Sequence, residues 1–290
     1  MKDMGHISVM KDEVLDFLAL RYPGKFLDMT FGGGGHTRAI LEGNPGNTVV
    51  AVDCDPEAHA RAEKIKADYP GRFEFVDSFF DEVAVKGKFS GILFDLGVSS
   101  FQLDTAERGF SFRADAPADM RMNPRAGVPA WKFIEDADNE TLTNVIRDYA
   151  EEPRWRNIVK ALETAKGSAQ IRTTLGLSDV ISKYTRGSGR IHPATRVFMG
   201  LRMAVNDEVG RLERALPKAF AMLSSGGILA VISFHSIEDR VAKLFFRSVT
   251  RPKDSAPATL LIKKVGRPTH GEKTTNARAR SAKLRVLQKI

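Results

Sequence analysis

Short apolar runs alternate with helical segments along the first 100 residues of the chain. The runs with the length and composition of buried strands are 25–29, 47–53, 72–76 and 89–96. Strands that alternate with helices need crossover connections, and these connections place the strands parallel in one sheet. The first third of the sequence therefore predicts an α/β fold.

The alternation stops between residues 101 and 205, where runs typical of strands are scarce. Three segments of this region have helical patterns and lie between loops that contain glycine and proline. These segments are 139–149, 153–165 and 194–206. The middle of the chain is therefore expected to be helical.

The strand pattern returns toward the C-terminus. A helix is predicted at 207–223, and the apolar run 228–234 after it is typical of another buried strand. The elements expected beyond that run are a helix at 237–247 and strands at 259–265 and 283–288. We therefore predict a discontinuous α/β domain, residues 1–100 and 206–290, into which an all-helical domain, residues 101–205, is inserted.

The composition excludes several classes of protein. With 42% hydrophobic residues among 290, the chain can bury a full core. It has no run near the roughly 18 apolar residues that span a bilayer. Cys54 is the only cysteine and the six histidines are scattered, so we expect neither a disulfide nor a structural metal. A cytoplasmic protein is the expectation.

The positive charge of the chain is concentrated at its C-terminal end. The net charge is +8, and residues 251–290 hold eleven Lys and Arg against two acids, Asp254 and Glu272. A localised basic segment is typical of a surface that contacts a nucleic acid backbone, because neutralised phosphates release their counterions. It also occurs as a solvated surface that keeps a protein soluble. Charge alone leaves both interpretations open.

Glycines and acidic residues gather at the ends of the predicted strands. The residues at or just after these ends are Asp28, Gly32 to Gly35, Asp53, Phe79, Asp95 and His235. The carboxyl ends of parallel strands share one edge of the sheet, and α/β proteins bind their ligands at that edge. The sequence therefore predicts a ligand site there.

The first of these loops is the run Phe31-Gly32-Gly33-Gly34-Gly35-His36. Glycine lets the chain turn sharply and lets a ligand approach the backbone where a Cβ would collide. The N–H groups of the following helix then suit a carboxylate or a phosphate. Asp53 lies about 20 residues beyond, where a carboxylate can accept hydrogen bonds from ribose hydroxyls. The alternative is that the glycines serve only a tight turn.

This arrangement fits either NAD or S-adenosylmethionine. The dinucleotide pattern G-x-G-x-x-G ends on a small residue, but its sixth position is Thr37 when it starts at Gly32 and Arg38 when it starts at Gly33. The phosphate-binding sequence G-K-[ST] is absent. Asp28 before the loop suits a cationic amino acid better than a pyrophosphate. These residues favour S-adenosylmethionine over NAD.

Eight segments, in order along the chain, resemble the RsmH (MraW) family of methyltransferases. They are DMTFGGGGH at 28–36, DLGVSSFQLD at 95–104, RGFSF at 108–112, DMRM at 119–122, HPATR at 192–196, VNDE at 205–208, SFHSIEDR at 233–240 and RARSAKLR at 278–285. The resemblance extends from His6 to the C-terminus. The chain departs from the family at Ser8 and Ala277, where proline is usual, and at Met199-Gly200, where Gln-Ala is common.

The resemblance implies a Rossmann-like class I S-adenosylmethionine-dependent methyltransferase sheet whose inserted domain recognises the substrate. It implies methylation of the N4 amine of a cytosine in the decoding region of 16S rRNA. The cofactor-binding residues that it implies are Gly33, Gly34, Gly35, His36, Asp53, Phe79, Asp95 and Gln102. Phe79 would form an apolar wall for adenine, although phenylalanine is more commonly a core residue. The implied partner is 16S rRNA within the small ribosomal subunit, with no membrane, and a homodimer is compatible with the resemblance.

Cytosine N4 is a poor nucleophile because its lone pair is delocalised into the ring, so the enzyme needs hydrogen-bond acceptors that face the amine. Many amino-methyltransferases have Asn/Asp/Ser-Pro-Pro-aromatic after the fourth strand, but this chain has Asp95-Leu96-Gly97-Val98-Ser99-Ser100. We hypothesise that Ser99 and His235 orient the amine or accept its proton. The alternative is that Ser99 caps a turn and His235 bonds neighbouring backbone.

The inserted region combines arginines with aromatic residues, a mixture suited to stacking on unpaired bases and to phosphate contact. These residues are Arg108, Phe110, Phe112, Arg121, Arg125, Arg154, Trp155 and Arg156. Phe110, Phe112 and Met120 are equally suited to form a small core of the region. Two other classes of protein compete with a methyltransferase. An NAD-dependent oxidoreductase fails the glycine pattern, and a non-catalytic RNA-binding protein leaves the strand-end residues without a role.

Overall fold

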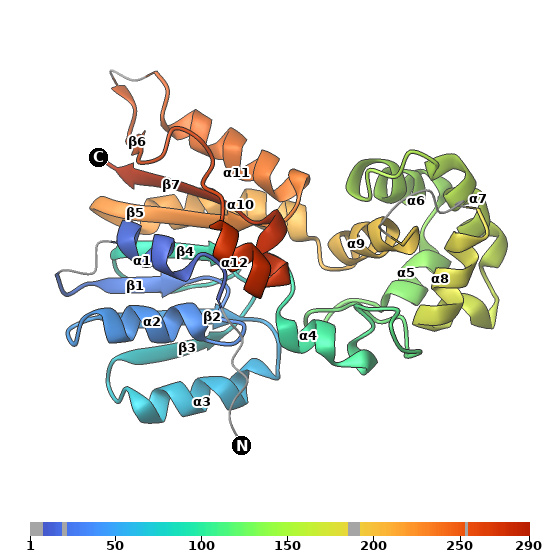
Figure 1. The fold of residues 1–290 in the computed structure, drawn as a ribbon, viewed down its shortest axis with the longest axis horizontal. Coiled ribbons are helices and arrows are strands. Elements are labelled where there is room, and N and C mark those ends of the chain that lie inside the picture. The colour runs from blue at the N-terminus through green and yellow to red at the C-terminus, as the bar shows by residue number, and fades with distance from the viewer. Residues whose placement is uncertain (1–7, 19–21, 185–191, 253–254) are drawn as a thin grey trace. The chain divides into compact units, whose positions relative to one another are not determined.

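The structure is a computed structural model, and it describes residues 8–18, 22–184, 192–252 and 255–290. The chain divides into two compact units. The sheet unit comprises Met1–Gly97 and Val209–Ile290, and the helical unit comprises Val98–Glu208. Figure 1 follows the chain through both units by colour.

The sheet unit is built on one seven-stranded sheet in the order β3-β2-β1-β4-β5-β7-β6. Its strands are β1 (Lys25–Asp28), β2 (Thr48–Asp53), β3 (Phe73–Asp77), β4 (Phe89–Asp95), β5 (Leu223–Ser233), β6 (Ala258–Leu260) and β7 (Lys283–Lys289). Strands β1 to β5 pair in parallel, and β7 runs antiparallel to both β5 and β6. The predicted Rossmann-like α/β class is confirmed.

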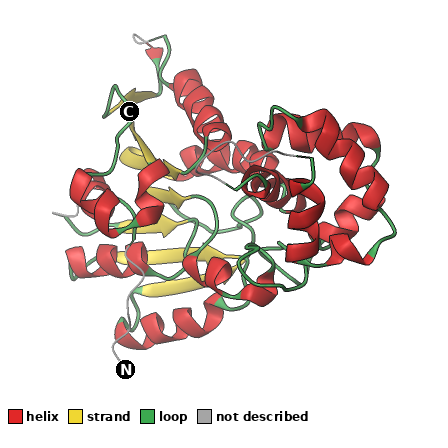
Figure 2. Ribbon diagram, turned by 45° about the vertical axis from the view of Figure 1, so that its right-hand side comes forward, coloured by secondary structure: helices red, strands yellow, loops and turns green. Residues whose placement is uncertain are grey.

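Helices cover both faces of this sheet (Figures 1 and 2). They are α1 (Lys11–Leu18), α2 (Gly35–Gly43), α3 (Ala58–Asp68), α10 (Glu208–Met222), α11 (Ser236–Val249) and the short α12 (His270–Thr275). Side chains alternate between the faces along a strand. On β1, Phe26 joins the core beneath α1, α2 and α3, whereas Leu27 joins the core beneath α10 and α11. Among the helices described, none has the length and apolarity that crossing a bilayer requires.

The junction between α10 and β5 differs from the predicted loop. Strand β5 begins at Leu223, directly after α10, and its pairing with β4 shifts from Phe89↔Leu223 to Gly91↔Ile228. The residues between these pairs form a bulge in which Gly226 has a φ of 75°. The Ser-Ser-Gly-Gly sequence that predicts a loop is therefore an irregular part of the strand.

The predicted strand 259–265 is wrong beyond its second residue, because β6 ends at Leu260. Leu261 N still donates to Val286 O at 3.1 Å, and Gly266 forms an isolated bridge with Leu284. The chain therefore leaves the ladder after β6 and follows β7 at single points. The segment from there to β7 is a long connection rather than a strand.

The helical unit has its own apolar core and, among its described residues, only helices, turns and loops apart from one isolated bridge (Figure 2). Its helices are α4 (Ser100–Asp104), α5 (Ala130–Asp136), α6 (Asn139–Asn144), α7 (Trp155–Ala165), α8 (Thr174–Ser182) and α9 (Ala194–Val205). The predicted helix 139–149 is split into α6 and a π turn, Val145–Tyr149. The sequence pattern does not predict α4, α5 and α8.

Helix α9 approaches the π turn closely at Gly200. A Cβ at this position would lie 2.8 Å from both the Cβ and the backbone N of Ala150. Such contacts are shorter than van der Waals separation, so even alanine would force the two elements apart. The departure from the family's alanine at Gly200 thus has a packing reason in this chain.

Candidate functional site

Three aspartates end neighbouring strands at one edge of the sheet. Asp28, Asp53 and Asp95 are the last residues of β1, β2 and β4, and β1 pairs with both other strands. The chain order reverses between β1 and β4, because β2 and β3 lie on one side of β1 and β4 and β5 on the other. Open α/β sheets bind ligands at such a switch point. The structure therefore brings these three carboxylates to the expected ligand edge.

Asp53 is tied to the glycine loop between β1 and α2. Its Oδ2 accepts a hydrogen bond from Gly32 N at 2.7 Å, and its Oδ1 accepts one from Asp55 N at 2.9 Å. Arg61 Nε donates to Gly32 O at 2.9 Å from the other side of the loop. Burial raises the pKa of Asp53 to about 6, against the opposing effect of the two N–H groups. Asp53 therefore changes charge near pH 6.

Gly34 serves the local packing of the loop. Its φ is 76°, and a Cβ there would lie 2.6 Å from Ile65 and 2.9 Å from the Phe31 ring. No side chain caps α2 at Gly34, and the helix begins at Gly35. The N–H groups in the first turn of a helix without a side-chain cap suit an anionic ligand group. The glycine run therefore combines a packing role with a candidate anion site.

Asp28 is buried and holds the start of α2 and the end of β4 together. Its Oδ2 accepts from Thr37 Oγ1 at 2.7 Å, and its Oδ1 accepts from Thr30 N at 3.1 Å. Thr30 Oγ1 in turn accepts from Asp95 N at 2.6 Å. Burial raises the pKa of Asp28 although both threonines stabilise the charged form. Thr30 and Thr37 therefore belong to this site, although the sequence alone does not identify them.

His36 and Asp95 carry unsatisfied polar atoms. The His36 Nε2 atom lies 3.4 Å from Asp95 Oδ2, and both side chains are largely buried. Neither ring nitrogen of His36 nor the Oδ1 atom of Asp95 has a hydrogen-bond partner among the described residues. Burial lowers the pKa of His36, but the nearby Asp95 and Asp28 outweigh burial, so the net shift is upward. Unpaired buried polar atoms are costly, which indicates that a polar ligand completes the site.

Phe79 lies just beyond β3 and is half-buried. The guanidinium carbon of Arg211 lies 3.6 Å from the centroid of its ring. Arg211 Nη1 also donates to Asp81 at 2.5 Å and to Glu82 at 2.8 Å, which fixes the cation over the ring. Arg211 comes from α10, more than 100 residues away, so no local sequence signal identifies it.

Ser99 and Gln102 belong to the helical unit and form a capping box at the start of α4. Gln102 N donates to Ser99 Oγ at 3.3 Å, and Ser99 N donates to Gln102 Oε1 at 3.0 Å. The capping interpretation of Ser99 therefore describes its local contacts. The Ser99 hydroxyl proton is not used by this arrangement, because the oxygen acts as acceptor.

His235 belongs to the sheet unit and caps the start of α11. Its Nδ1 accepts from Glu238 N at 3.4 Å, and its Nε2 lies 3.0 Å from Glu238 Oε1. Glu238 is buried, and its Oε2 also accepts from Phe234 N at 2.9 Å. The sequence signal for Glu238 is its position three residues after a helix cap, where an acidic residue is favoured. A carboxylate beside Nε2 fixes the orientation of the imidazole.

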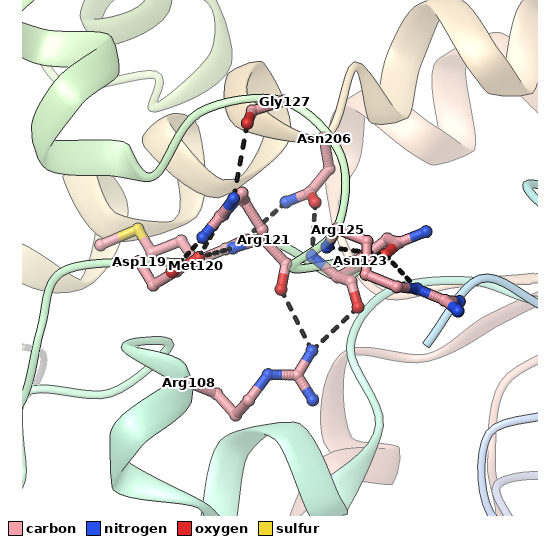
Figure 3. Close-up of polar contacts among 9 residues, drawn as sticks. Arg108, Asp119, Met120, Arg121, Asn123, Arg125, Gly127 and Asn206 are labelled. Atoms are coloured by element: carbon pink, nitrogen blue, oxygen red, sulfur yellow. Dashed lines mark hydrogen bonds and ion pairs between the residues drawn. The ribbon is translucent and has the colours of Figure 1, made fainter. Parts of the chain in front are cut away.

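Three of the family-like segments meet in the helical unit (Figure 3). Arg108 is buried and donates to the carbonyls of Arg121 and Met122 at 3.1 and 2.8 Å. Asn206 Nδ2 donates to Met120 O at 2.8 Å, and Asn206 Oδ1 accepts from Met122 N at 2.7 Å. Arg108 and Asn206 therefore hold the 119–122 loop by its backbone.

The aromatic and arginine residues of the helical unit divide into two groups. Phe110 and Met120 are buried in its core, which favours the core interpretation for both. Arg156 lies 4.2 Å from the Trp155 ring centroid, and both Arg154 and Arg156 are exposed. Of the remaining residues, Phe112 packs against His192 and Phe198, Arg121 pairs with Asp119, and Arg125 bonds to Asn123.

Comparison with known proteins gives consistent matches along the whole chain. Residues 3–290 match the MraW methylase family. Ribosomal RNA small subunit methyltransferase H of Methylobacterium nodulans is 45% identical over 304 residues, covering 97% of this chain and 89% of the relative. The protein of the same name from Heliobacterium modesticaldum is 42% identical over 311 residues, covering 98% of each. A solved rRNA methylase structure from Streptococcus thermophilus is 13% identical, with a TM-score of 0.47 and 99% coverage of both chains.

The match to the family and the identity to its relatives both extend over nearly the full sequence. The range matched by the family, residues 3–290, contains the glycine loop, the strand-end aspartates and the segments that meet in the helical unit. The resemblance drawn from the eight motifs is therefore confirmed. The chain belongs to the MraW methylase family.

Proposed function

We propose that the chain is an S-adenosylmethionine-dependent methyltransferase that modifies the N4 amine of a cytosine in the decoding region of 16S rRNA. Relatives named ribosomal RNA small subunit methyltransferase H match this chain over 97% or more of its length. The structural observation that carries the cofactor assignment is the buried, unpartnered Oδ1 of Asp95 at the switch point of the sheet. A carboxylate in that position suits the ammonium of a methionine moiety.

The residues of the ligand edge fit S-adenosylmethionine group by group. The first turn of α2, which has no side-chain cap, would offer N–H groups to the methionine carboxylate, and the unpartnered Asp95 Oδ1 would accept from its ammonium. Each oxygen of Asp53 accepts one backbone hydrogen bond and has a second lone pair for a ribose hydroxyl. When bound, the cofactor supplies an electrophilic methyl group. The residues that we propose bind it are Gly33, Gly34, Gly35, His36, Asp53, Phe79, Asp95 and Gln102.

An NAD-dependent oxidoreductase is the competing enzyme class. Thr37 stands where the dinucleotide pattern needs a small residue, and its hydroxyl is fixed by a 2.7 Å hydrogen bond to Asp28. Titration of the purified protein with S-adenosylmethionine and with NADH separates the two classes. We expect saturable binding of S-adenosylmethionine only, and binding of NADH alone would exclude a methyltransferase.

Cofactor affinity should depend on pH through Asp53. Because its pKa is raised to about 6, the carboxylate is charged at pH 7.5 and largely protonated at pH 5. A charged carboxylate is the stronger acceptor for ribose hydroxyls. We therefore expect affinity to fall as the pH drops through about 6, measured by calorimetry between pH 5 and 7.5.

The Asp53→Asn variant is the control for that profile. It has no titrating group at this position, so its affinity should be lower at pH 7.5 and vary less between pH 5 and 7.5. Equal pH dependence in the variant and the wild type would assign the effect to another group. His36 would then be the next candidate for the titrating group, because its pKa is also raised.

Ser99 and His235 are our candidates for orienting the cytosine amine or accepting its proton. In the reaction the N4 lone pair forms the new N–C bond, the methyl–sulfur bond breaks, and one amine proton leaves to an acceptor. His235→Asn keeps a helix-capping acceptor but cannot take a proton at neutral pH. We expect His235→Asn and Ser99→Ala each to lower kcat by about 100-fold, the scale of general-base catalysis.

The readout that separates catalysis from capping is cofactor affinity. A proton-handling role lowers kcat and leaves the dissociation constant for S-adenosylmethionine within about threefold. Ser99→Thr retains both the hydroxyl and the cap, so it should restore most of the rate. Near-normal kcat in both His235→Asn and Ser99→Ala would remove these residues from the mechanism.

We propose that residues 1–100 and 206–290 form the methyltransferase domain and that residues 101–205 recognise the substrate. The exposed Arg154 and Arg156 beside Trp155 support a substrate role for the inserted residues, since arginine and tryptophan suit unpaired RNA. We further propose that the substrate is 16S rRNA within the small ribosomal subunit, in the cytoplasm. A homodimer is the assembly that we propose, and sedimentation of the purified chain tests it.

A further inference from the structure

The excess positive charge of the protein lies on the sheet unit. Residues 98–208, the helical unit, hold sixteen Lys and Arg against fifteen Asp and Glu. Residues 251–290 of the sheet unit hold eleven against two. Binding to an RNA backbone depends on cations that neighbouring acids do not neutralise. The C-terminal segment is therefore the stronger candidate for phosphate contact.

Three cations of this segment form ion pairs or hydrogen bonds within the sheet unit. Lys283 and Arg285, both on β7, bind Asp239 of α11 at 3.0 and 2.8 Å. Lys289 Nζ donates to two backbone carbonyls at 3.1 and 3.0 Å. These side chains attach β7 to its neighbours, so they are not the groups that a phosphate would meet.

The connection between β6 and β7, residues 261–282, carries cations that are exposed rather than bonded within the sheet. Lys263, Lys264 and Arg267 are exposed, and none of them pairs with an acid in the described part of the chain. Arg280 is also exposed, and its Nε donates to a backbone carbonyl at 3.2 Å. We call these four residues the basic connection.

Backbone hydrogen bonds and a buried side chain hold the basic connection in place. Gly266 and Leu284 exchange two backbone hydrogen bonds, at 2.9 and 3.1 Å, and Ala279 is fully buried. Glu272 is the only acid of residues 261–282, and its Oε1 accepts from Met10 N at 2.7 Å. Because that carboxylate accepts from a backbone N–H, it forms no ion pair with the four cations in the described part of the chain. A surface that is already held in place loses less entropy on binding than a loose tail.

The register of the sheet places the connection between β6 and β7 at the ligand edge. Ser233, at the carboxyl end of β5, pairs with Lys283, the first residue of β7. The connection therefore enters β7 at the edge where Asp28, Asp53 and Asp95 end their strands. Figure 1 shows α12, which is part of the connection, at this end of the strands.

We propose that Lys263, Lys264, Arg267 and Arg280 bind the ribose-phosphate backbone of the rRNA strand whose base enters the site. The proposal rests on the proposed function, and it assigns backbone contact to the sheet unit. Unpaired lysine and arginine side chains on an ordered surface match the repeating negative charge of RNA without reading its sequence. The contact holds the RNA strand beside the ligand edge of the sheet while its target base enters the site.

The test uses poly-uridylate as a single-stranded probe, because backbone contact is independent of sequence. The variant is K263Q/K264Q/R267Q, and the control is K64Q/K66Q/K86Q, which removes three exposed charges elsewhere on the sheet unit. Each lost contact to a single strand lowers affinity about fourfold at 0.15 M salt, so the variant should bind about 50-fold more weakly. Its plot of log affinity against log salt should be shallower by about 2. The control should stay within about threefold of wild type.

Equal affinities of the variant and the control would overturn the proposal. So would normal poly-uridylate binding combined with reduced methylation of small ribosomal subunits, which would assign the cations to an acidic protein partner. Failure of the proposed function is seen separately. In that case the wild type transfers no methyl group to small subunits, whatever its affinity for poly-uridylate.

Discussion

Asp95→Ala is expected to weaken S-adenosylmethionine binding by roughly 100-fold, equivalent to about 3 kcal/mol. The Oδ1 atom of Asp95 is shielded from solvent and has no hydrogen-bond partner among the described residues, so a cationic ligand group would satisfy it. Removing the carboxylate leaves the ligand's ammonium without a charged acceptor in a buried place. The measurement is isothermal titration calorimetry at pH 7.5.

Asp77→Ala is the matched control, because Asp77 also ends a strand at this edge of the sheet. Its side chain pairs with exposed His59 at 2.9 Å, and such exposed pairs contribute little energy. We expect this variant to bind the cofactor within about threefold of wild type. Equal losses in both variants, or no loss in Asp95→Ala, would contradict the assignment of Asp95.

Gly109→Ala is expected to destabilise the helical unit by about 3 kcal/mol or more. Gly109 has a φ of 73°, and a Cβ there would lie 2.4 Å from Pro117 O and 2.5 Å from Asp119 N. Backbone atoms cannot move aside as a flexible side chain can, so the loop beside Arg108 must shift. Urea denaturation followed by tryptophan fluorescence reports on this unit alone, because Trp131 and Trp155 are the two tryptophans of the chain.

Gly127→Ala separates steric collision from backbone strain. Gly127 has a similar φ of 66°, but a Cβ there would meet nothing within 4 Å. The control therefore carries only the cost of a left-handed alanine, about 1 kcal/mol. If the two variants were destabilised equally, the collision at Gly109 would not be the cause.

The parallel half of the sheet is well predicted because buried parallel strands are continuous apolar runs. The run 47–53 becomes β2 and the run 89–96 becomes β4, each within one residue. The run 283–288 likewise becomes β7 within one residue. The prediction fails for β6, which has only three residues and lies at the edge of the sheet. In such a strand the pairing with β7, rather than the local pattern, decides where the strand ends.

The short helices α4, α5 and α8 of the helical unit are also not predicted, because short elements give too little periodic signal. Helix α8 carries usable signals, namely the cap at Thr173 and buried apolar residues at Leu177, Val180 and Ile181. With nine residues it spans too few turns for periodicity alone to identify it. The π turn after α6 lies close to Gly200 of α9, and no local pattern encodes that tertiary contact.

The positions of the ligand edge follow from the sequence, but the contacts of its side chains do not. Strand ends predict where Asp28, Asp53 and Asp95 lie, because parallel strands end at one edge. The partners of other site residues come from distant segments, as when Arg211 stacks on Phe79. Such pairs depend on the packing of α10 against the sheet, and a single sequence does not reveal them.

The proposed activity is tested by methylation of small ribosomal subunits with the purified chain. The subunits come from cells that lack the corresponding methyltransferase, the methyl donor is isotopically labelled S-adenosylmethionine, and the rRNA is mapped by mass spectrometry. We expect one labelled methyl group, on N4 of a cytosine in the decoding region of 16S rRNA. A label on another nucleotide, or no transfer by a protein that binds the cofactor, would contradict it.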